Sequence, residues 1–335
     1  MKKSLVVYFI IFISSTFVFS QFERINGVSL VSVKEPLDST HVLPIQNIGA
    51  NWVAVVPFCD FDSICEGKLA YNQEWEFYGE RLNGARQIVK QLKNHGISIM
   101  MKPQIREEDG LYVGHINFSK KREWRTFEQS YKEYILDFVL LAEEEHVELF
   151  CIGTELRKFV KSRPKFWRRL IKEIREIYSG KITYAANWDD YDEFPFWEQL
   201  DFIGVDAYFP ISKKETPTIK DLEEGWQPIL KKMEKISDEN GKRILLTEYG
   251  YRSIEKSAAK PWLHTSNAVF DEESQFNSLS ALYNTIWNRK FVVGGFLWRW
   301  YPYHPNSGGK NDIKYTVQNK LAEKLVGVTY RKTGK

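Results

Sequence analysis

The chain has 335 residues, 43% of them hydrophobic, and its 47 Lys and Arg residues nearly balance its 44 Asp and Glu residues. This supply of apolar side chains is enough for a packed core and excludes a chain that is disordered throughout. The formal charge of +3 is carried by scattered cations, which excludes an extended basic face for nucleic acid, so we expect a neutral partner.

The first 20 residues have the pattern of a secretory signal peptide. Two lysines precede an apolar run, and Val18 and Ser20 are small residues ahead of a cleavage point. An uncleaved membrane anchor is the alternative, although the apolar run is short for a full membrane span. We therefore predict a signal peptide over residues 1–20, a mature chain over residues 21–335, and a secreted or periplasmic location without stable membrane insertion.

The three cysteines divide into a pair and a single residue. After export, Cys59 and Cys65 can close a small loop as a disulfide, a pairing that the sequence leaves open. Cys151 lies inside an apolar run, so we interpret it as a residue of the core and not as a nucleophile. The six histidines are scattered, and no Cys or His pair recurs at the spacing of a zinc site. We predict no metal and no cofactor.

Eight apolar runs bounded by turn residues predict eight strands. They cover residues 27–33, 52–58, 98–105, 149–156, 181–188, 202–209, 243–251 and 294–302. Helical patterns separate most of these strands, and several of the helices end at a glycine. The helical patterns cover residues 80–96, 127–147, 165–180 and 222–241.

The alternation of strands and helices predicts a parallel sheet. Eight such units, with strands that are apolar on both faces, favour a single-domain (β/α)8 TIM barrel over an open doubly wound sheet. An open sheet that binds nucleotides would carry a Gly-rich loop after an early strand, and the sequence has no such loop. No linker or low-complexity run divides the chain.

Two of the predicted strands end in glutamate, Glu155 on the fourth and Glu248 on the seventh. In a (β/α)8 barrel the C-terminal ends of the strands surround one active site, so both carboxylates should lie at the same mouth. Retaining hydrolysis of a glycosidic bond needs an acid for the leaving oxygen and a carboxylate about 5–5.5 Å away that attacks the anomeric carbon. Glu155 alone is equally compatible with an ion pair to Arg157 or Lys102, but the two glutamates together favour catalysis.

Aromatic residues at the other strand ends are candidates for contacts with a sugar. Trp188 and Trp298 offer ring faces against which the C–H groups of a sugar can pack. Tyr208 or Tyr251 can donate a hydrogen bond that keeps Glu248 ionised, and both are candidates for substrate binding.

Polar residues at the strand ends complete the predicted site. Lys102 and Asn187 are candidates for substrate binding. Asp206 is either a substrate contact or a buried partner of Lys102, and the second interpretation is slightly favoured because a buried carboxylate needs a cation.

Five short segments along the chain carry a more specific pattern. They are IGTEL at 152–156, ANWDDY at 186–191, FIGVDAYFP at 202–210, LLTEYGY at 245–251 and GFLWRWYP at 295–302. In this order they resemble glycoside hydrolase family 113, which is known chiefly for β-mannanases. The resemblance implies that Glu155 is the acid/base and Glu248 the nucleophile of a retaining enzyme.

The residue before Glu155 departs from the pattern of the wider clan. Many clan members carry Asn there, in contact with the sugar 2-hydroxyl, whereas this chain has Thr154, which is similar to family 113. The 2-hydroxyl contact is therefore left open between Asn187 and Lys102. The insertion DFDSICEG at residues 60–67 also departs from the family pattern, and the subsites beside it are left unassigned.

The sequence thus predicts a retaining glycoside hydrolase that acts on β-linked glycans with two glutamates. The resemblance implies β-mannan or manno-oligosaccharides as the substrate. A glycosidase of the same clan for β-glucan or xylan, and a non-catalytic glycan-binding barrel, are the alternatives. We expect a monomer, and the sequence leaves the choice between endo and exo action open.

Overall fold

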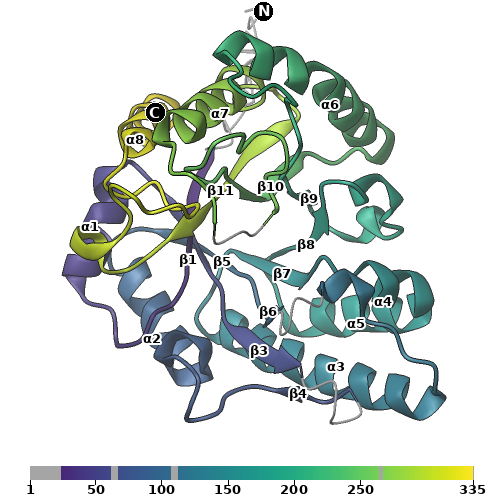
Figure 1. Ribbon diagram of the computed structural model, residues 1–335. Coiled ribbons are helices and arrows are strands. Elements are labelled where there is room, and N and C mark those ends of the chain that lie inside the picture. Colours follow the sequence, from purple (N-terminus) through teal and green to yellow (C-terminus); the bar gives the residue numbers. More distant parts are fainter. Residues whose placement is uncertain (1–23, 62–66, 107–111, 264–266, 335) are drawn as a thin grey trace, which may run out of the picture.

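Eight parallel strands close into a barrel that is surrounded by helices (Figure 1). The computed structural model describes residues 24–61, 67–106, 112–263 and 267–334. Neighbouring strands of the barrel follow one another in chain order, so the predicted single-domain (β/α)8 barrel is confirmed. The strands are β1 (Ile25–Leu30), β2 (Trp52–Val55), β5 (Ser98–Met101), β7 (Leu149–Thr154), β8 (Lys181–Asn187), β9 (Ile203–Asp206), β10 (Ile244–Tyr249) and β11 (Val292–Trp300).

The helices pack their apolar stripes on the outside of the barrel (Figure 1). Local signals set their ends: Pro164 occupies the first turn of α5, Thr218 caps α6, and Gly241 ends α6 in the left-handed conformation. The α-helices are α1 (Ser39–Asn47), α2 (Leu82–Lys93), α3 (Lys121–Glu144), α4 (Arg157–Ser162), α5 (Pro164–Ile177), α6 (Ile219–Asn240), α7 (Glu272–Thr285) and α8 (Leu321–Thr333). Short 3-10 helices are η1 (Tyr78–Glu80), η2 (Val113–His115), η3 (Tyr191–Glu193), η4 (Trp197–Gln199) and η5 (His304–Asn306).

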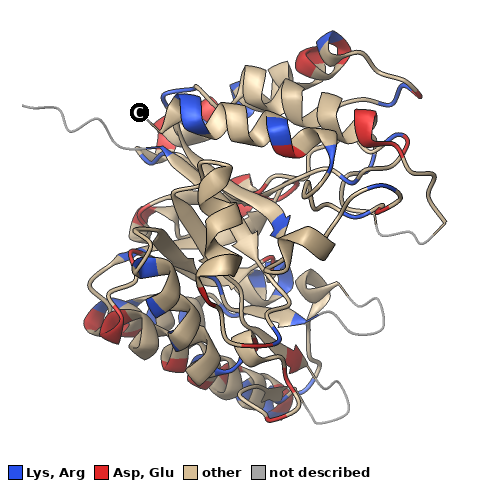
Figure 2. Cartoon of the chain, turned by 90° about the vertical axis from the view of Figure 1, so that its left-hand side faces the viewer, with Lys and Arg blue, Asp and Glu red and all other residues tan. Residues whose placement is uncertain are grey.

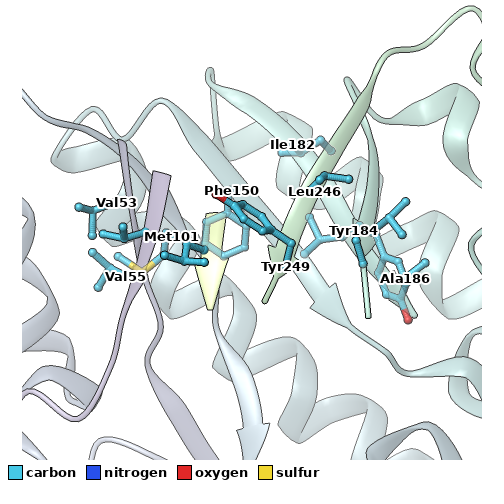
Figure 3. Packing of buried hydrophobic residues seen from close by; sticks show 14 of the residues in the cluster. Val53, Val55, Met101, Phe150, Ile182, Tyr184, Ala186, Leu246 and Tyr249 are labelled. Carbon is cyan, nitrogen blue, oxygen red and sulfur yellow. The ribbon is translucent and has the colours of Figure 1, made fainter. Parts of the chain in front are cut away.

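Alternate side chains of each barrel strand face two different cores, because successive residues of a strand point to opposite faces. On β2, Ala54 packs inside the barrel with Cys151, while Val53 and Val55 pack in the layer between the strands and the helices. Figure 3 shows part of this outer layer. Cys151 is fully buried in the inner core, as the sequence predicted.

Two prolines end barrel strands earlier than the apolar runs predicted. The predicted strands 52–58 and 98–105 are each divided, at Pro57 and Pro103, because proline lacks the N–H that a barrel ladder requires. Beyond these prolines the chain forms a separate three-stranded sheet in the order β4-β3-β6. Its strands are β3 (Phe58–Phe61), β4 (Leu69–Ala70) and β6 (Gln104–Arg106). This sheet carries Gln104 toward the mouth of the barrel.

Some expectations concern residues that the structure does not describe. The predicted signal peptide, residues 1–20, lies outside the described residues, and it stays a prediction. Cys59 is buried and its thiol is free, so the structure does not support the disulfide with Cys65, which itself lies outside the described residues. Within the described part of the chain, no helix is long and apolar enough to cross a membrane. Figure 2 shows Lys and Arg positions interspersed with Asp and Glu positions along the helices.

Candidate active site

A cavity of about 740 Å³ lies at the C-terminal ends of the barrel strands. Most of the predicted site residues line its wall, although they come from five different strands and the loops that follow them. These residues are Glu155, Asn187, Trp188, Tyr208, Glu248 and Trp298. The barrel therefore brings the two glutamates to one cavity, as their positions at the ends of β7 and β10 predicted.

Glu248 lies near the end of β10 and is 6% exposed. Its Oε1 atom accepts hydrogen bonds from Lys102 Nζ and, at 2.7 Å, from Gln104 Nε2. Its Oε2 atom accepts a hydrogen bond from the Tyr208 hydroxyl at 2.7 Å. Both oxygens of the Glu248 carboxylate therefore have donors, and these donors fix its orientation at the cavity.

Tyr208 is the tyrosine that contacts Glu248, of the two that the sequence offered. Burial, followed by the charge of Glu248, raises the pKa of Tyr208 well above its ordinary value. The hydroxyl therefore keeps the proton that it donates. Tyr251 is fully buried, does not line the cavity, and its hydroxyl has no hydrogen-bond partner among the described residues. The structure thus does not place Tyr251 where a substrate would contact it.

Lys102 is fully buried between two carboxylates and is not part of the cavity wall. It pairs with Glu248, and its Nζ atom lies 3.5 Å from Asp206 Oδ2. Burial alone lowers the pKa of a lysine, but the charges of Asp206 and Glu248 outweigh it and raise the pKa of Lys102 above its ordinary value. The predicted pairing of Asp206 with Lys102 is confirmed. The structure does not support direct contact of Lys102 with a substrate, because its ammonium group already pairs with the carboxylates of Asp206 and Glu248.

Glu155 follows β7 directly, lines the cavity and is half-buried. Its backbone adopts the left-handed region with φ of 56°, an uncommon conformation for a residue with a side chain. The amide of Glu155 donates to the carbonyl of Ala185 at 2.8 Å, and its carbonyl accepts from the amide of Arg157 at 2.9 Å. These bonds hold the sharp turn that ends the strand with the side chain at the cavity.

A glycine allows η2 to approach Glu155 closely. A Cβ atom on Gly114 would lie 2.9 Å from the carbonyl oxygen of Glu155 and 2.4 Å from the ring of Tyr112. A larger residue at this position would therefore push η2 away from the turn. The Tyr112 ring lines the cavity, and its buried hydroxyl has no hydrogen-bond partner among the described residues.

The cations that the sequence offered as structural partners of Glu155 have other carboxylate partners. Arg157 pairs with Asp189 and, at 2.5 Å, with Asp190. Lys102 pairs with Glu248 and Asp206.

An aromatic pair forms one part of the cavity wall. The rings of Trp188 and Trp262 stack with their centroids 4.7 Å apart and an angle of 22° between their planes. Trp262 is 39% exposed, which is unusual for so large an apolar side chain. The sequence did not identify Trp262, because it lies in the long connection after β10 and becomes a neighbour of Trp188 only in the folded barrel.

Gln104, Tyr112 and Tyr315 also belong to the site, although they were not among the predicted site residues. Gln104 was visible in the sequence beside Lys102, at the end of the third predicted strand. Tyr112 and Tyr315 lie in loops without a distinctive pattern, so no local signal pointed to them. In the described part of the chain, no group of three or more His, Cys, Asp or Glu residues is arranged to hold a metal ion.

A comparison with models of protein families finds a match to Glycoside Hydrolase Family 113 over residues 34–320. No curated protein matches the chain significantly. Among solved structures, a GH113 beta-1,4-mannanase in a complex is 21% identical with a TM-score of 0.79, and the match covers 92% of this chain and 99% of that one.

Two further structures show how far the fold is shared. The GH113 beta-mannanase from Alicyclobacillus acidocaldarius is 20% identical with a TM-score of 0.78, and the match covers 93% of this chain and 99% of that one. A beta-glucuronidase from Faecalibacterium prausnitzii is 15% identical with a TM-score of 0.62, and the match covers 92% of this chain but 49% of that one. At these identities the solved structures show a common barrel fold.

Proposed function

Because the chain belongs to glycoside hydrolase family 113 and is therefore an O-glycosyl hydrolase with a carbohydrate substrate, we propose that it is a retaining β-mannanase. The observation that carries this proposal is the presence of two glutamates with unequal surroundings on one cavity. Glu248 is buried among three donors, and Glu155 is half-buried. Retaining hydrolysis requires this inequality, because one carboxylate must attack as an anion while the other carries a proton.

Glu248 suits the role of nucleophile. In the first step one of its oxygens bonds to the anomeric carbon, and the glycosidic bond breaks. Lys102, Gln104 and Tyr208 hold the carboxylate in one orientation before this attack. This arrangement lowers the entropy that must be lost when the nucleophile meets the sugar.

Glu155 suits the role of general acid and base. It donates its proton to the leaving oxygen in the first step. In the second step it accepts a proton from the water that attacks the anomeric carbon, and Glu248 is released. The partial exposure of Glu155 on the cavity wall favours this role, because Glu155 must exchange protons with a leaving group and with water.

The aromatic side chains on the cavity wall support a carbohydrate chain as the substrate. Trp298 and the stacked pair Trp188–Trp262 line the cavity and present ring faces or edges to it. Of the two residues considered for the sugar 2-hydroxyl, Asn187 lines the cavity and Lys102 does not. We therefore assign the 2-hydroxyl contact to Asn187. The preference for mannose rests on family membership and on the mannanases among the similar structures.

A product screen tests this function directly. The purified chain is incubated with β-mannan, β-glucan, xylan and their oligosaccharides, and the products are separated and identified. NMR of an early digest gives the anomeric configuration of the first-formed sugar. We expect cleavage of mannan, with the configuration of the broken bond retained.

Other outcomes of the screen separate the alternatives. Cleavage of glucan or xylan with mannan untouched would replace the substrate but leave the mechanism in place. Inversion of configuration would exclude the double displacement. Binding of glycans without any turnover would favour a glycan-binding barrel.

A further inference from the structure

Asp206 has no part in the proposed two-step mechanism, but its carboxylate is buried beside the site, with the residue only 1% exposed. A buried carboxylate is costly unless a cation and hydrogen bonds compensate for the lost water. Asp206 Oδ2 lies 3.5 Å from Lys102 Nζ, and Asp206 Oδ1 accepts a hydrogen bond from the Thr247 hydroxyl at 2.7 Å. Lys102 also contacts Glu248. One buried cation therefore serves two carboxylates.

The charge balance of these three side chains changes during the proposed reaction. With all three ionised, the free enzyme holds one cation against two anions. When Glu248 forms its ester with the sugar it loses its charge, and Lys102 and Asp206 then balance each other. The buried cluster is thus neutral in the glycosyl-enzyme and negative in the free enzyme.

We propose that Asp206 is a positioning residue that shares Lys102 with the nucleophile, and so keeps Glu248 reactive and the glycosyl-enzyme electrically balanced. This inference rests on the proposed function. In the free enzyme, Asp206 competes with Glu248 for the lysine and prevents the ion pair from over-stabilising the nucleophile. In the glycosyl-enzyme, Asp206 remains as the partner of a lysine that would otherwise be a buried unpaired cation.

The surroundings of Asp206 support this competition. Asp206 and Glu248 are register partners on the adjacent strands β9 and β10, so the sheet fixes their separation. Burial and the charge of Glu248 raise the pKa of Asp206 to about 7, and Lys102 and Thr247 oppose this effect. Such opposing influences are expected where two acids share one cation.

Replacing Asp206 by a neutral residue should change the two steps in opposite directions. In Asp206→Asn, Lys102 pairs with Glu248 alone, which stabilises the free carboxylate relative to the ester. Formation of the bond from Glu248 to the anomeric carbon should therefore slow. Hydrolysis of that bond should accelerate, because it releases the Glu248 carboxylate, which can then pair with Lys102 again. A general loss of structure would instead slow both steps.

A 2-deoxy-2-fluoro-β-mannosyl fluoride separates the steps, because it forms the glycosyl-enzyme and releases it slowly. The rate of inactivation reports formation of the ester with loss of fluoride, and the rate of reactivation reports its hydrolysis. At pH 8, we expect Asp206→Asn to inactivate about tenfold more slowly and to reactivate about tenfold faster than the wild type, since each tenfold change in rate corresponds to about 1.4 kcal/mol of activation free energy.

Two further variants make the test specific to charge. Thr247→Val removes the hydroxyl that donates a hydrogen bond to Asp206. It should slow inactivation and speed reactivation as Asp206→Asn does, but by a smaller factor. This variant replaces Asp206→Asn in the test if Asp206→Asn does not fold. The double variant Lys102→Met/Asp206→Asn restores the net charges of the wild-type cluster, so the ratio of the two rates should return toward the wild-type ratio.

The outcomes distinguish this inference from the function on which it rests. Equal slowing of both rates in Asp206→Asn, or two unchanged rates, would overturn the role of Asp206 while the mechanism stands. A wild-type enzyme that cleaves β-mannan but forms no covalent adduct with the fluoride would overturn the retaining mechanism, and the role of Asp206 with it.

Discussion

Glu248 and Glu155 end two strands of the same barrel, but the chain surrounds them differently. Glu248 is 6% exposed, and its carboxylate accepts hydrogen bonds from Lys102, Gln104 and Tyr208. Glu155 lines the same cavity but is half-buried, on a turn with φ of 56°. One glutamate is therefore enclosed by donors, and the other is partly open to solvent.

In the proposed mechanism, environment and not residue type assigns the two chemical roles. Three donors hold the Glu248 carboxylate in one orientation, whereas the partial exposure of Glu155 gives it access to water and to the leaving group. Substitution of Glu248 should therefore affect formation and hydrolysis of the glycosyl-enzyme. Substitution of Glu155 or of Trp262 on the cavity wall should affect proton transfer or substrate binding. Three substitutions test this division.

The largest effect should follow Glu248→Ala, which removes the nucleophile. We expect the kcat for an aryl β-mannoside to fall by about 10,000-fold or more. Azide can enter the vacated space and attack from the face that Glu248 occupied, so the product should have the inverted configuration, as NMR can show. Glu224→Ala, on the exposed surface of α6, is a matched control that should keep full activity. Near-normal turnover by Glu248→Ala would show that Glu248 is not the nucleophile.

Glu155→Ala should give a smaller loss that depends on the leaving group. Substrates whose leaving group needs a proton should slow by about 100- to 10,000-fold, the usual contribution of a general acid. A dinitrophenyl β-mannoside should retain rapid formation of the glycosyl-enzyme, because its leaving group needs no proton. Azide should then yield a product of retained configuration. Equal losses with good and poor leaving groups would argue against Glu155 as the acid.

Trp262→Ala tests the open side of the cavity. Loss of its ring from the stack with Trp188 should raise the KM for manno-oligosaccharides by about three- to tenfold, since one aromatic contact contributes about 0.5 to 1.5 kcal/mol. The kcat should change little, because the Trp262 ring stacks on Trp188, whereas the hydrogen bonds to Glu248 come from Lys102, Gln104 and Tyr208. Trp75→Ala is the matched control, because Trp75 is 65% exposed and does not line the cavity. An equal rise in KM in both variants would show that the effect is not specific to the cavity.

Glu76 extends the comparison to a buried carboxylate without a lysine beside it. It is 5% exposed, and its Oε1 atom has no hydrogen-bond partner among the described residues. Burial raises the pKa of Glu76 to about 7, and the charges of Asp60 and Glu80 add to this effect, while the amide of Gln73 opposes it. The folded chain thus binds a proton more tightly here than the unfolded chain, in which a glutamate has a pKa of about 4.3.

The stability of the fold should consequently fall as the pH rises from about 4.3 to 7, because ionisation of Glu76 is more costly in the folded state. Glu76→Gln removes this contribution. Relative to the wild type, the variant should gain roughly 1 to 2 kcal/mol between pH 5 and pH 8, measured by urea unfolding at both values. A constant difference between the two proteins at both pH values would show that Glu76 ionises normally in the folded state.

The sequence by itself determined the barrel and the position of both glutamates. Apolar runs of strand length alternate with amphipathic helices, and such periodicity is a local property that only a few folds satisfy. The rule that parallel strands in a barrel end at one mouth then placed Glu155 and Glu248 together. Tyr208, Asn187, Trp188 and Trp298 followed from the same rule, because they also lie at strand ends.

Only the tertiary structure decided which of these side chains meet. Lys102 and Glu248 are 146 residues apart, and their contact depends on the closure of the sheet. Tyr251 is two residues beyond the end of β10 but points into the core, and Pro57 and Pro103 carry the chain out of the barrel before the apolar runs end. Trp262 reaches Trp188 through a loop whose path no periodic pattern describes. Local patterns are set by near neighbours in the chain, whereas these contacts are set by how distant segments pack.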